Sequence, residues 1–206
     1  MKSKKDVMIW AERSLGAENI KAMRIAVAGL IFNAFGKILL HCRGPVAMDA
    51  VGCLEGIGGS LEETEEELQP ALMRELQEEI AGRSTNGQIV PCRFSIDRFL
   101  VCSHLQFEST DGALKDWAVA TFLCRLLDGE PTVGVGEWGR TMGIGWFDIA
   151  EFDSWTADQR REVSLVDCEG KPFKKEVGLS IWVPVVIEEY KRQHGHEPWR
   201  GFERQL

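Results

Sequence analysis

Apolar side chains recur every four residues along the segment 68–80. The positions on this spacing are Leu68, Leu72, Leu76 and Ile80, with Met73 widening the apolar stripe. This period is typical of a helix that buries one face against a core. The segment therefore predicts an amphipathic α-helix.

Shorter apolar runs rich in β-branched and aromatic residues predict strands. They cover residues 23–32, 37–42, 51–54, 92–103, 117–127 and 146–147. Asn33 to Gly36 reads as the turn of a hairpin between the first two runs, and Asp111-Gly112 as a turn between the fourth and the fifth. We expect these strands to join in one mixed sheet.

Two further helices are expected after the strands. Ser180 to Gln193 has helical character, with Pro184 tolerated only in the first turn. Ser154 or Thr156 is a suitable N-cap for another helix that runs to about Val163.

The chain of 206 residues is long enough for one domain with an extension. We expect residues 1–20 to be an N-terminal extension, in which Val7 to Leu15 fits either a short helix or an edge strand. Residues 21–206 are expected to form a single domain that includes the C-terminal helix.

Three carboxylates crowd one patch of the predicted helix, because Glu75, Glu78 and Glu79 stand at positions i, i+3 and i+4. Clustered carboxylate oxygens without thiolates or imidazoles suit a hard cation such as Mg²⁺. The alternative is an ordinary solvated face, since glutamates are good helix formers.

The residues around this patch resemble the Nudix box, written Gly-x5-Glu-x7-Arg-Glu-U-x-Glu-Glu-x-Gly-U, where U is aliphatic. Its Arg-Glu-U-x-Glu-Glu core is matched without a gap by Arg74, Glu75, Leu76, Glu78 and Glu79. Glu66 lies eight residues before Arg74, as the box requires. The chain is therefore similar to Nudix hydrolases over residues 59–82.

The match has two departures. Gly59 lies seven residues before Glu66 where the box has six, so the loop carries one extra residue and, counted strictly, Ser60 occupies the glycine position. Ala81 and Gly82 stand where the box has glycine and an aliphatic residue, and we expect Gly82 to end the helix in a left-handed C-cap.

The resemblance implies an α/β (α+β) fold, namely an α/β/α sandwich in which a central mixed sheet lies between the box helix and the C-terminal helix. It also implies hydrolysis of the pyrophosphate linkage of a nucleoside diphosphate joined to another moiety. Mg²⁺, for which Mn²⁺ can substitute, would be held by Glu75, Glu78, Glu79 and the Gly59 carbonyl, while Arg74 orients the glutamates.

Nudix enzymes often take one more carboxylate from a loop outside the box. We single out Glu137, since Gly134, Gly136 and Gly139 surround it in a segment, 131–145, that is expected to be a long flexible loop. Glu130 and Asp116 are the competing candidates.

Arg43, at the end of the second strand, is a candidate for contact with a substrate phosphate or base. A solvated arginine at a strand end is the alternative.

Charge and composition exclude several other classes. The net charge is −8, and eight acidic residues and one arginine within 62–79 account for −7 of it, so no basic surface for duplex nucleic acid is expected. The six cysteines are dispersed and form no C-x-x-C pair, which argues against a zinc ribbon and a thioredoxin-type redox site. No apolar run is long enough to span a membrane. We expect a cytoplasmic protein with a small nucleotide-type substrate, as a monomer or a homodimer.

Two other functions stay open from the sequence alone. One is a nucleotide-sensing or interaction module that keeps the fold but has lost efficient turnover. The altered spacing of the loop before the box helix is compatible with this function. The other is a Nudix-related isomerase acting on a diphosphate ester.

Overall fold

The computed structural model describes residues 1–20, 23–84, 86–109 and 111–199. Its α-helices are α1 (Lys4–Leu15), α2 (Leu68–Glu79) and α3 (Trp182–His194), and its 3-10 helices are η1 (Ala17–Asn19), η2 (Val135–Glu137) and η3 (Ile149–Asp153). Its strands are β1 (Arg24–Phe32), β2 (Ile38–Arg43), β3 (Cys53–Glu55), β4 (Ile57–Ser60), β5 (Ile80–Arg83), β6 (Ile89–Pro91), β7 (Arg93–Glu108), β8 (Leu114–Asp128), β9 (Glu130–Val133), β10 (Thr141–Phe147), β11 (Arg161–Val166) and β12 (Pro172–Leu179).

The large sheet is mixed, as expected, and β1 pairs with three of its other strands. β1 runs parallel to β8, with Arg24 opposite Trp117 and Phe32 opposite Arg125, and antiparallel to β2 and β4. The strand order is β10-β11-β12-β3-β2-β1-β8-β7, with β4 paired to β1 beside this path. A small second sheet has the order β6-β5-β9.

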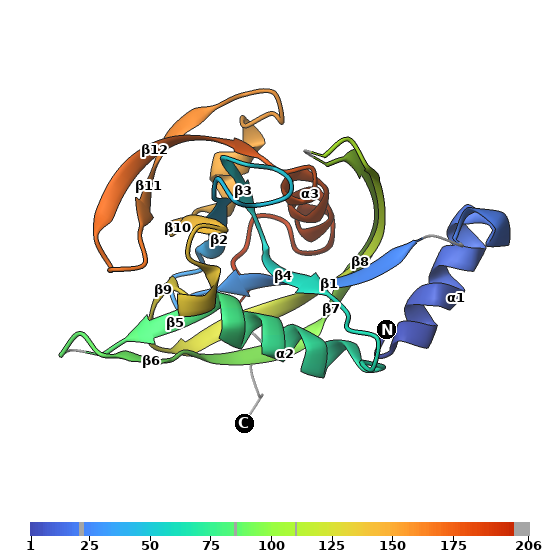
Figure 1. Ribbon diagram of the computed structural model, residues 1–206, viewed down its shortest axis with the longest axis horizontal. Helices are drawn as coiled ribbons and strands as arrows, with labels where there is room; N and C mark the ends of the chain where they lie inside the picture. Colours follow the sequence, from blue (N-terminus) through green and yellow to red (C-terminus); the bar gives the residue numbers. More distant parts are fainter. Residues whose placement is uncertain (21–22, 85, 110, 200–206) are drawn as a thin grey trace.

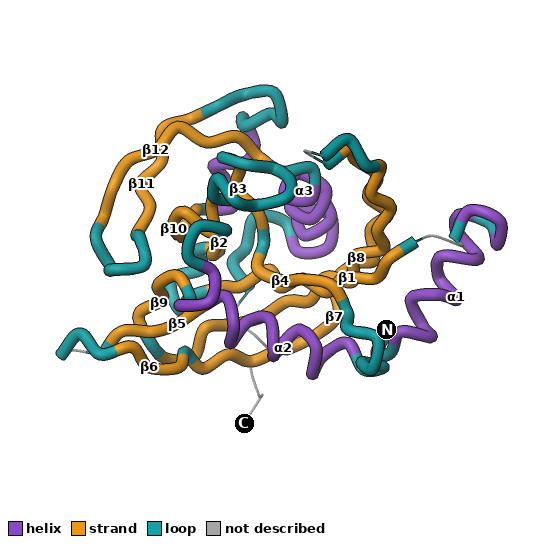
Figure 2. The backbone as a smooth tube through the Cα atoms, viewed as in Figure 1, coloured by secondary structure: helices purple, strands orange, loops and turns teal. Residues whose placement is uncertain are grey.

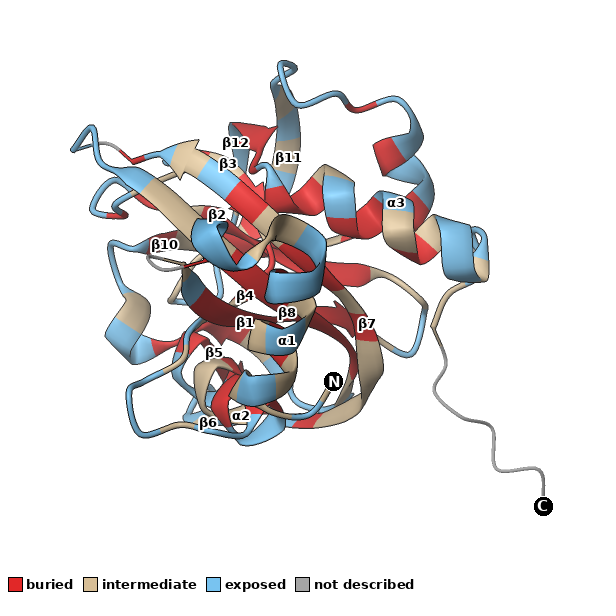
Figure 3. Ribbon diagram, turned by 90° about the vertical axis from the view of Figure 1, so that its right-hand side faces the viewer, coloured by how far each residue is buried: buried red, intermediate tan, exposed pale blue. Residues whose placement is uncertain are grey.

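Side chains alternate across β1 and bury two cores. All residues of β1 except the first are buried, as the colouring of this strand in Figure 3 indicates. Ala28 and Leu30 face the core that contains α3, whereas Val27 and Ile31 face the core that contains α2. The period of two along the strand therefore places the sheet between the two helices (Figure 1), which confirms the predicted sandwich.

The N-terminal segment is attached to the start of α2. Its Val7 to Leu15 part is helical, and Val7 is buried in the α2 core. The Leu68 amide donates to the Lys2 carbonyl, so this segment satisfies one of the open amides of the α2 N-terminus. The predicted boundary between the N-terminal extension, residues 1–20, and the domain, residues 21–206, falls at residues 21–22. These two residues lie outside the described part of the chain, so the boundary stays a prediction.

The helix expected from Ser154 or Thr156 to Val163 is wrong. A short 3-10 helix precedes these residues, and Val163 lies in β11, where it is paired with Lys175 of β12. β11 and β12 form a hairpin that is paired to the rest of the sheet, β11 with β10 and β12 with β3 (Figure 1). Pairing with a distant segment has overridden the local capping pattern.

The long loop expected over 131–145 is also wrong, since only the stretch between β9 and β10 is non-strand, and part of it is η2 (Figure 2). Gly143 and Gly145 lie in β10 because other side chains pack closely there. A Cβ at Gly143 would lie 2.8 Å from the Phe173 ring, and one at Gly145 would lie 3.0 Å from Leu165 Cδ2. These glycines serve close packing rather than flexibility.

Gly82 does not cap the box helix. The helix ends at Glu79, and the chain continues directly as β5, in which Gly82 is paired with Val90 of β6 and Pro131 of β9. A Cβ at Gly82 would lie 3.1 Å from both Cys92 Sγ and the Val90 carbonyl oxygen. The glycine therefore permits close strand packing.

Among the described residues, no helix has the length and apolar character needed to cross a membrane.

Candidate active site

A cavity of about 450 Å³ lies beside the carboxyl-terminal half of α2. Its walls come from α2, β4, the segments that follow β2 and β9, and the hairpin of β7 and β8. It brings together Arg43, Gly59, Glu75, Glu78, Glu79 and Glu137. Among the predicted site residues, Arg74 lies behind these glutamates rather than on the cavity wall.

Two glycines let β4 pass between β1 and the box helix. A Cβ at Gly58 would lie 2.1 Å from the Val27 carbonyl oxygen, and one at Gly59 would lie 2.6 Å from the carboxyl group of Glu75. Ser60 is exposed and needs no such approach. This close approach supports Gly59, rather than Ser60, as the glycine of the box.

Arg74 is held by Glu65 rather than by Glu66. Its Nε donates to Glu65 Oε1 at 2.9 Å and its Nη2 to Glu65 Oε2 at 3.0 Å, a two-pronged pair that fixes the guanidinium plane. Glu65 stands six residues after Gly59, the spacing that the box requires. The extra residue therefore lies between Glu65 and Arg74, not between Gly59 and the glutamate.

The Nη1 atom of Arg74 contacts two of the box glutamates, Glu75 and Glu78. This atom lies 2.8 Å from Glu75 Oε1 and 3.2 Å from Glu78 Oε2. Burial raises the pKa of Glu75; Arg74 opposes this shift, and the nearby charges of Glu78 and Glu65 add to it. One arginine thus holds two carboxylates together at the cavity wall.

Glu79 is the buried member of the group, with 7% of its surface exposed. The Gly58 amide donates to its Oε2 at 3.1 Å. Burial raises the pKa of Glu79 to about 7, and the charges of Glu137 and Glu75 add to this shift while His41 opposes it. A carboxylate in this position gains from a cation that would offset its lost hydration.

Glu137 reaches the cavity because its segment is docked on the end of α2. The Gly134 amide donates to the Glu79 carbonyl at 2.7 Å, and a Cβ at Gly134 would lie 2.0 Å from the Glu78 carbonyl oxygen. Glu137 Oε1 lies 3.8 Å from Arg140 Nη1 and contacts no other cation among the described residues.

The two competing carboxylates lie elsewhere. Glu130 lines a separate cavity of about 330 Å³ beside Arg83 and Gly170. Asp116 is paired with His104, whose Nε2 lies 2.7 Å from Asp116 Oδ1. Of the three loop candidates, Glu137 is the one that lines the cavity of the box glutamates.

Arg43 lines the cavity and is part of a half-buried charge network. Its Nη2 lies 2.5 Å from Asp49 Oδ1, and its Nε lies 3.3 Å from Glu55 Oε2. His41, which is 2% exposed, places Nε2 3.9 Å from the same Glu55 oxygen, while its Nδ1 lies 3.1 Å from Thr141 Oγ1. The arginine at the strand end is therefore held in place rather than freely solvated.

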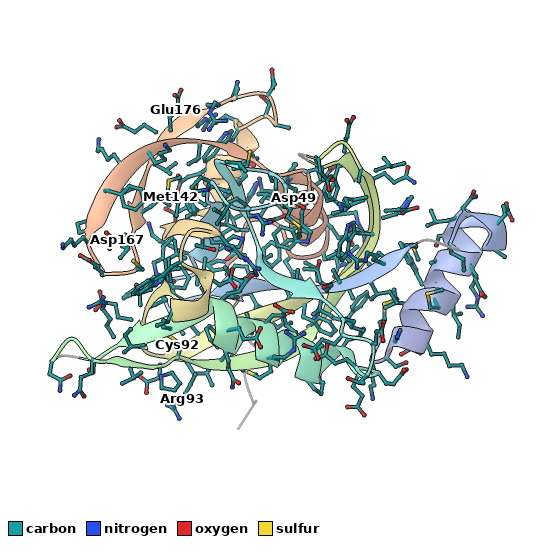
Figure 4. All side chains as sticks on the ribbon, in the orientation of Figure 1. Asp49, Cys92, Arg93, Met142, Asp167 and Glu176 are labelled. Carbon is teal, nitrogen blue, oxygen red and sulfur yellow. The ribbon has the colours of Figure 1, made fainter. Side chains whose placement is uncertain are left out.

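Sequence reasoning missed Asp49, Glu55 and His41. A histidine inside the apolar strand 38–43 and a glutamate directly before Gly56, at the start of the glycine-rich stretch 56–59, are signals that could have drawn attention to two of them. Asp49 carries no such signal. It belongs to the loop between β2 and β3, where Figure 4 labels it.

The cavity has a strong excess of negative charge. Two guanidinium groups and six carboxylates line it, namely Arg43, Arg140, Asp49, Glu55, Glu75, Glu78, Glu79 and Glu137. Oxygen donors without thiolates suit Mg²⁺, so the residues present fit such an ion. Within the described part of the chain, no three acidic, histidine or cysteine groups already converge on one point.

A model of the NUDIX domain matches residues 22–166 of the chain. The MutT protein of Methanosarcina mazei Go1 has a similar structure, with a TM-score of 0.57, 15% sequence identity, and coverage of 84% of this chain and 96% of that chain. A NUDIX hydrolase from Nitrosomonas europaea has a TM-score of 0.54 at 20% identity and covers 83% of this chain and 90% of its own.

The NUDIX domain of NrtR from Shewanella oneidensis, solved in complex with ADP ribose, has a TM-score of 0.53 at 14% identity over 90% of this chain and 97% of that one. A search of curated proteins found no match. These identities show the shared fold, while the domain model covers most of the sequence and the box residues lie together at one cavity. The chain belongs to the NUDIX domain family and has the architecture of a Nudix-type pyrophosphohydrolase.

Proposed function

We propose that the chain is a Mg²⁺-dependent hydrolase that cleaves the pyrophosphate linkage of a nucleoside diphosphate joined to another moiety. The observation that carries this proposal is the cavity in which six carboxylates face two guanidinium groups. A pyrophosphate would be repelled from such a cavity unless divalent cations entered with it. Clustered glutamates at the end of the box helix would provide the place for them.

The site residues would have different roles in the reaction. Glu75, Glu78, Glu79 and the Gly59 carbonyl would hold the metal ions, which on binding supply charge neutralisation at the phosphates and activation of a water molecule. Arg74, anchored by Glu65, keeps Glu75 and Glu78 side by side. Arg43, held by Asp49 and Glu55, would contact a phosphate or the base of the substrate.

Glu137 is the proposed general base. Its carboxylate lines the same cavity as the box glutamates and has only a distant arginine, at 3.8 Å, as a described partner. A carboxylate without a close cation is free to accept the proton of an attacking water.

The experiment is a turnover assay of the purified protein on ADP-ribose, UDP-glucose, NADH and a dinucleoside tetraphosphate. We expect nucleoside monophosphate products from at least one compound with Mg²⁺ or Mn²⁺ and none with EDTA. Turnover that persists without a divalent ion would contradict the proposal. The Glu130→Gln protein is the matched control, since Glu130 lies at the separate cavity and its loss should leave turnover unchanged.

A nucleotide-sensing module is the alternative. It predicts binding of one of these compounds without products at any metal concentration. The presence of Glu75, Glu78 and Glu79 at one cavity favours the enzyme.

A further inference from the structure

A second wall of the active-site cavity is apolar. It is formed by Leu105 and Phe107 of β7, Trp117 and Val119 of β8, and Trp182 of α3. These side chains come from elements other than the box helix, so the cavity has a charged wall and an apolar wall.

The sheet register explains why there is room beside this wall. Leu105 is paired with Trp117, and Ala26 of β1 is paired with Val119. Because side chains two residues apart share a face, Ala26 and Ala28 lie on the same side as Trp117. Two small side chains at the centre and larger ones at the edge leave a hollow over β1.

The Trp117 side chain is held in place by contacts with the core and by a neighbouring arginine. The Arg24 guanidinium lies 5.4 Å from its ring centroid, and the indole packs against the core that includes α3. Trp182 is likewise fixed, since its Nε1 donates to Thr121 Oγ1 at 3.3 Å. Rigid aromatic surfaces of this kind suit a flat ring, because little side-chain entropy is lost on binding.

The carboxylates of Asp49 and Glu55 line the same cavity, and each has one oxygen atom that accepts no hydrogen bond from a described residue. Arg43 takes Oδ1 of Asp49 and Oε2 of Glu55, and no described residue donates to Asp49 Oδ2 or Glu55 Oε1. Burial works to raise the pKa of Glu55, but His41 and Arg43 lower it below its usual value, so this group stays an acceptor at neutral pH. An acceptor pair selects a ligand with N–H donors.

We infer that this part of the cavity binds a nucleobase that carries an exocyclic amino group. The flat ring lies against the wall of Phe107 and Trp117, and its amino group donates to Asp49 or Glu55. This inference rests on the proposed function for the placement of the phosphates at the glutamates. It adds that a base with an exocyclic amino group is preferred over the same ring in which hydrogen replaces that group.

The test compares ligands that differ only in the amino group. The pairs are AMP with purine riboside 5′-monophosphate, and GMP with IMP, and dissociation constants are measured by calorimetry. We expect the amino-bearing member of each pair to bind about ten-fold more tightly, which is typical of a hydrogen bond to a charged group. Equal affinity within both pairs would overturn the inference.

Variants separate the two parts of the subsite. Trp117→Ala should weaken all four ligands by about ten-fold with the amino preference kept, because stacking does not depend on the amino group. Asp49→Asn and Glu55→Gln should reduce the amino preference, and Asp49 lies in a loop, so its variant tests the idea even if Glu55→Gln fails to fold. Glu130→Gln should behave as wild type. A full preference in both the Asp49 and Glu55 variants would refute the assignment.

The design separates this inference from the proposed function. Binding of monophosphates does not require hydrolysis, so an amino preference without any turnover would support the subsite and remove the hydrolase. Turnover of a nucleoside diphosphate compound without any amino preference would support the hydrolase and remove the subsite.

Discussion

The backbone amide of Gly58 donates a hydrogen bond to Glu79 Oε2 over 3.1 Å. Strand β4 is thereby linked to the last residue of the box helix. The carboxylate that receives this bond is buried, and burial raises its pKa to about 7. Metal binding therefore requires Glu79 to be ionised, whereas burial in the metal-free protein favours its neutral form.

The first prediction concerns Glu79→Gln. We expect turnover to be nearly abolished, while the melting temperature of the metal-free protein stays level or rises, because an amide of the same size removes a buried charge and its repulsion from Glu75 and Glu137. Thermal unfolding in EDTA and a turnover assay test this. A large loss of stability in the metal-free protein would make Glu79 a structural residue.

The second prediction is the pH dependence of the metal-free protein. The folded state binds the Glu79 proton more tightly than the unfolded chain, whose carboxyl has a pKa near 4.5, so the free energy of unfolding should fall as the pH rises from 4.5 to about 7. The fall attributable to this group is at most about 3 kcal/mol. Urea unfolding in EDTA at pH 5 and pH 8 measures it. The same fall in the Glu79→Gln protein would show that another group is responsible.

A third prediction separates the two glycines of β4. Gly59→Ala places a Cβ 2.6 Å from the Glu75 carboxyl, at the end of a flexible side chain that can move aside. We expect kcat to fall by about 100-fold, with a stability loss under about 1 kcal/mol.

Gly58→Ala should show the opposite pattern, because its Cβ would lie 2.1 Å from the Val27 carbonyl oxygen, which is fixed in the sheet. We expect a stability loss of about 3 kcal/mol or failure to fold. Ser60→Ala, at an exposed position, is the control and should resemble wild type. Turnover of Gly59→Ala at the wild-type rate would show that Glu75 keeps its function when displaced.

The fourth prediction tests where the extra residue lies. Glu65→Gln removes the charge that binds Arg74 at 2.9 and 3.0 Å, so Arg74 would turn more fully toward Glu75 and Glu78 and compete with the metal. We expect kcat/KM to drop by about ten-fold and the Mg²⁺ concentration for half activity to rise. Glu66→Gln should change neither quantity. The reverse result would make Glu66 the glutamate on which Arg74 depends.

The box helix and the sandwich could be predicted because their signals are local. Leu68, Leu72 and Leu76 repeat with the helical period and are all buried, and the apolar runs of β1 and β8 are long enough to mark central strands. The carboxylate positions followed from the same helix geometry. These features depend little on the rest of the chain.

Other features depend on partners that are distant in sequence. Three consecutive glutamates, 65 to 67, are equivalent as residue types, and only the folded loop selects Glu65 for Arg74. Val163 became a strand residue through pairing with β12. Trp117 looked like any other core aromatic, because the small Ala26 and Ala28 that make room beside it lie some ninety residues earlier.

The last prediction concerns Glu137. It lines the cavity of the box glutamates, its charge is felt by Glu79, and its segment is fastened to the end of α2 through the hydrogen bond from the Gly134 amide to the Glu79 carbonyl. The side chain is 17% exposed and lies 3.8 Å from Arg140. A general base held in this way contributes about 100-fold or more to turnover.

Glu137→Gln should therefore lower kcat by about 100-fold with KM and product binding little changed, since the amide keeps the size of the side chain but cannot accept the proton. Glu130→Gln and Asp116→Asn are the matched controls, because these carboxylates lie at the separate cavity and at His104. Rates of all three variants are measured from pH 6 to pH 9. If Glu137→Gln stays within a few fold of wild type over this range, the proton is accepted by a box glutamate instead.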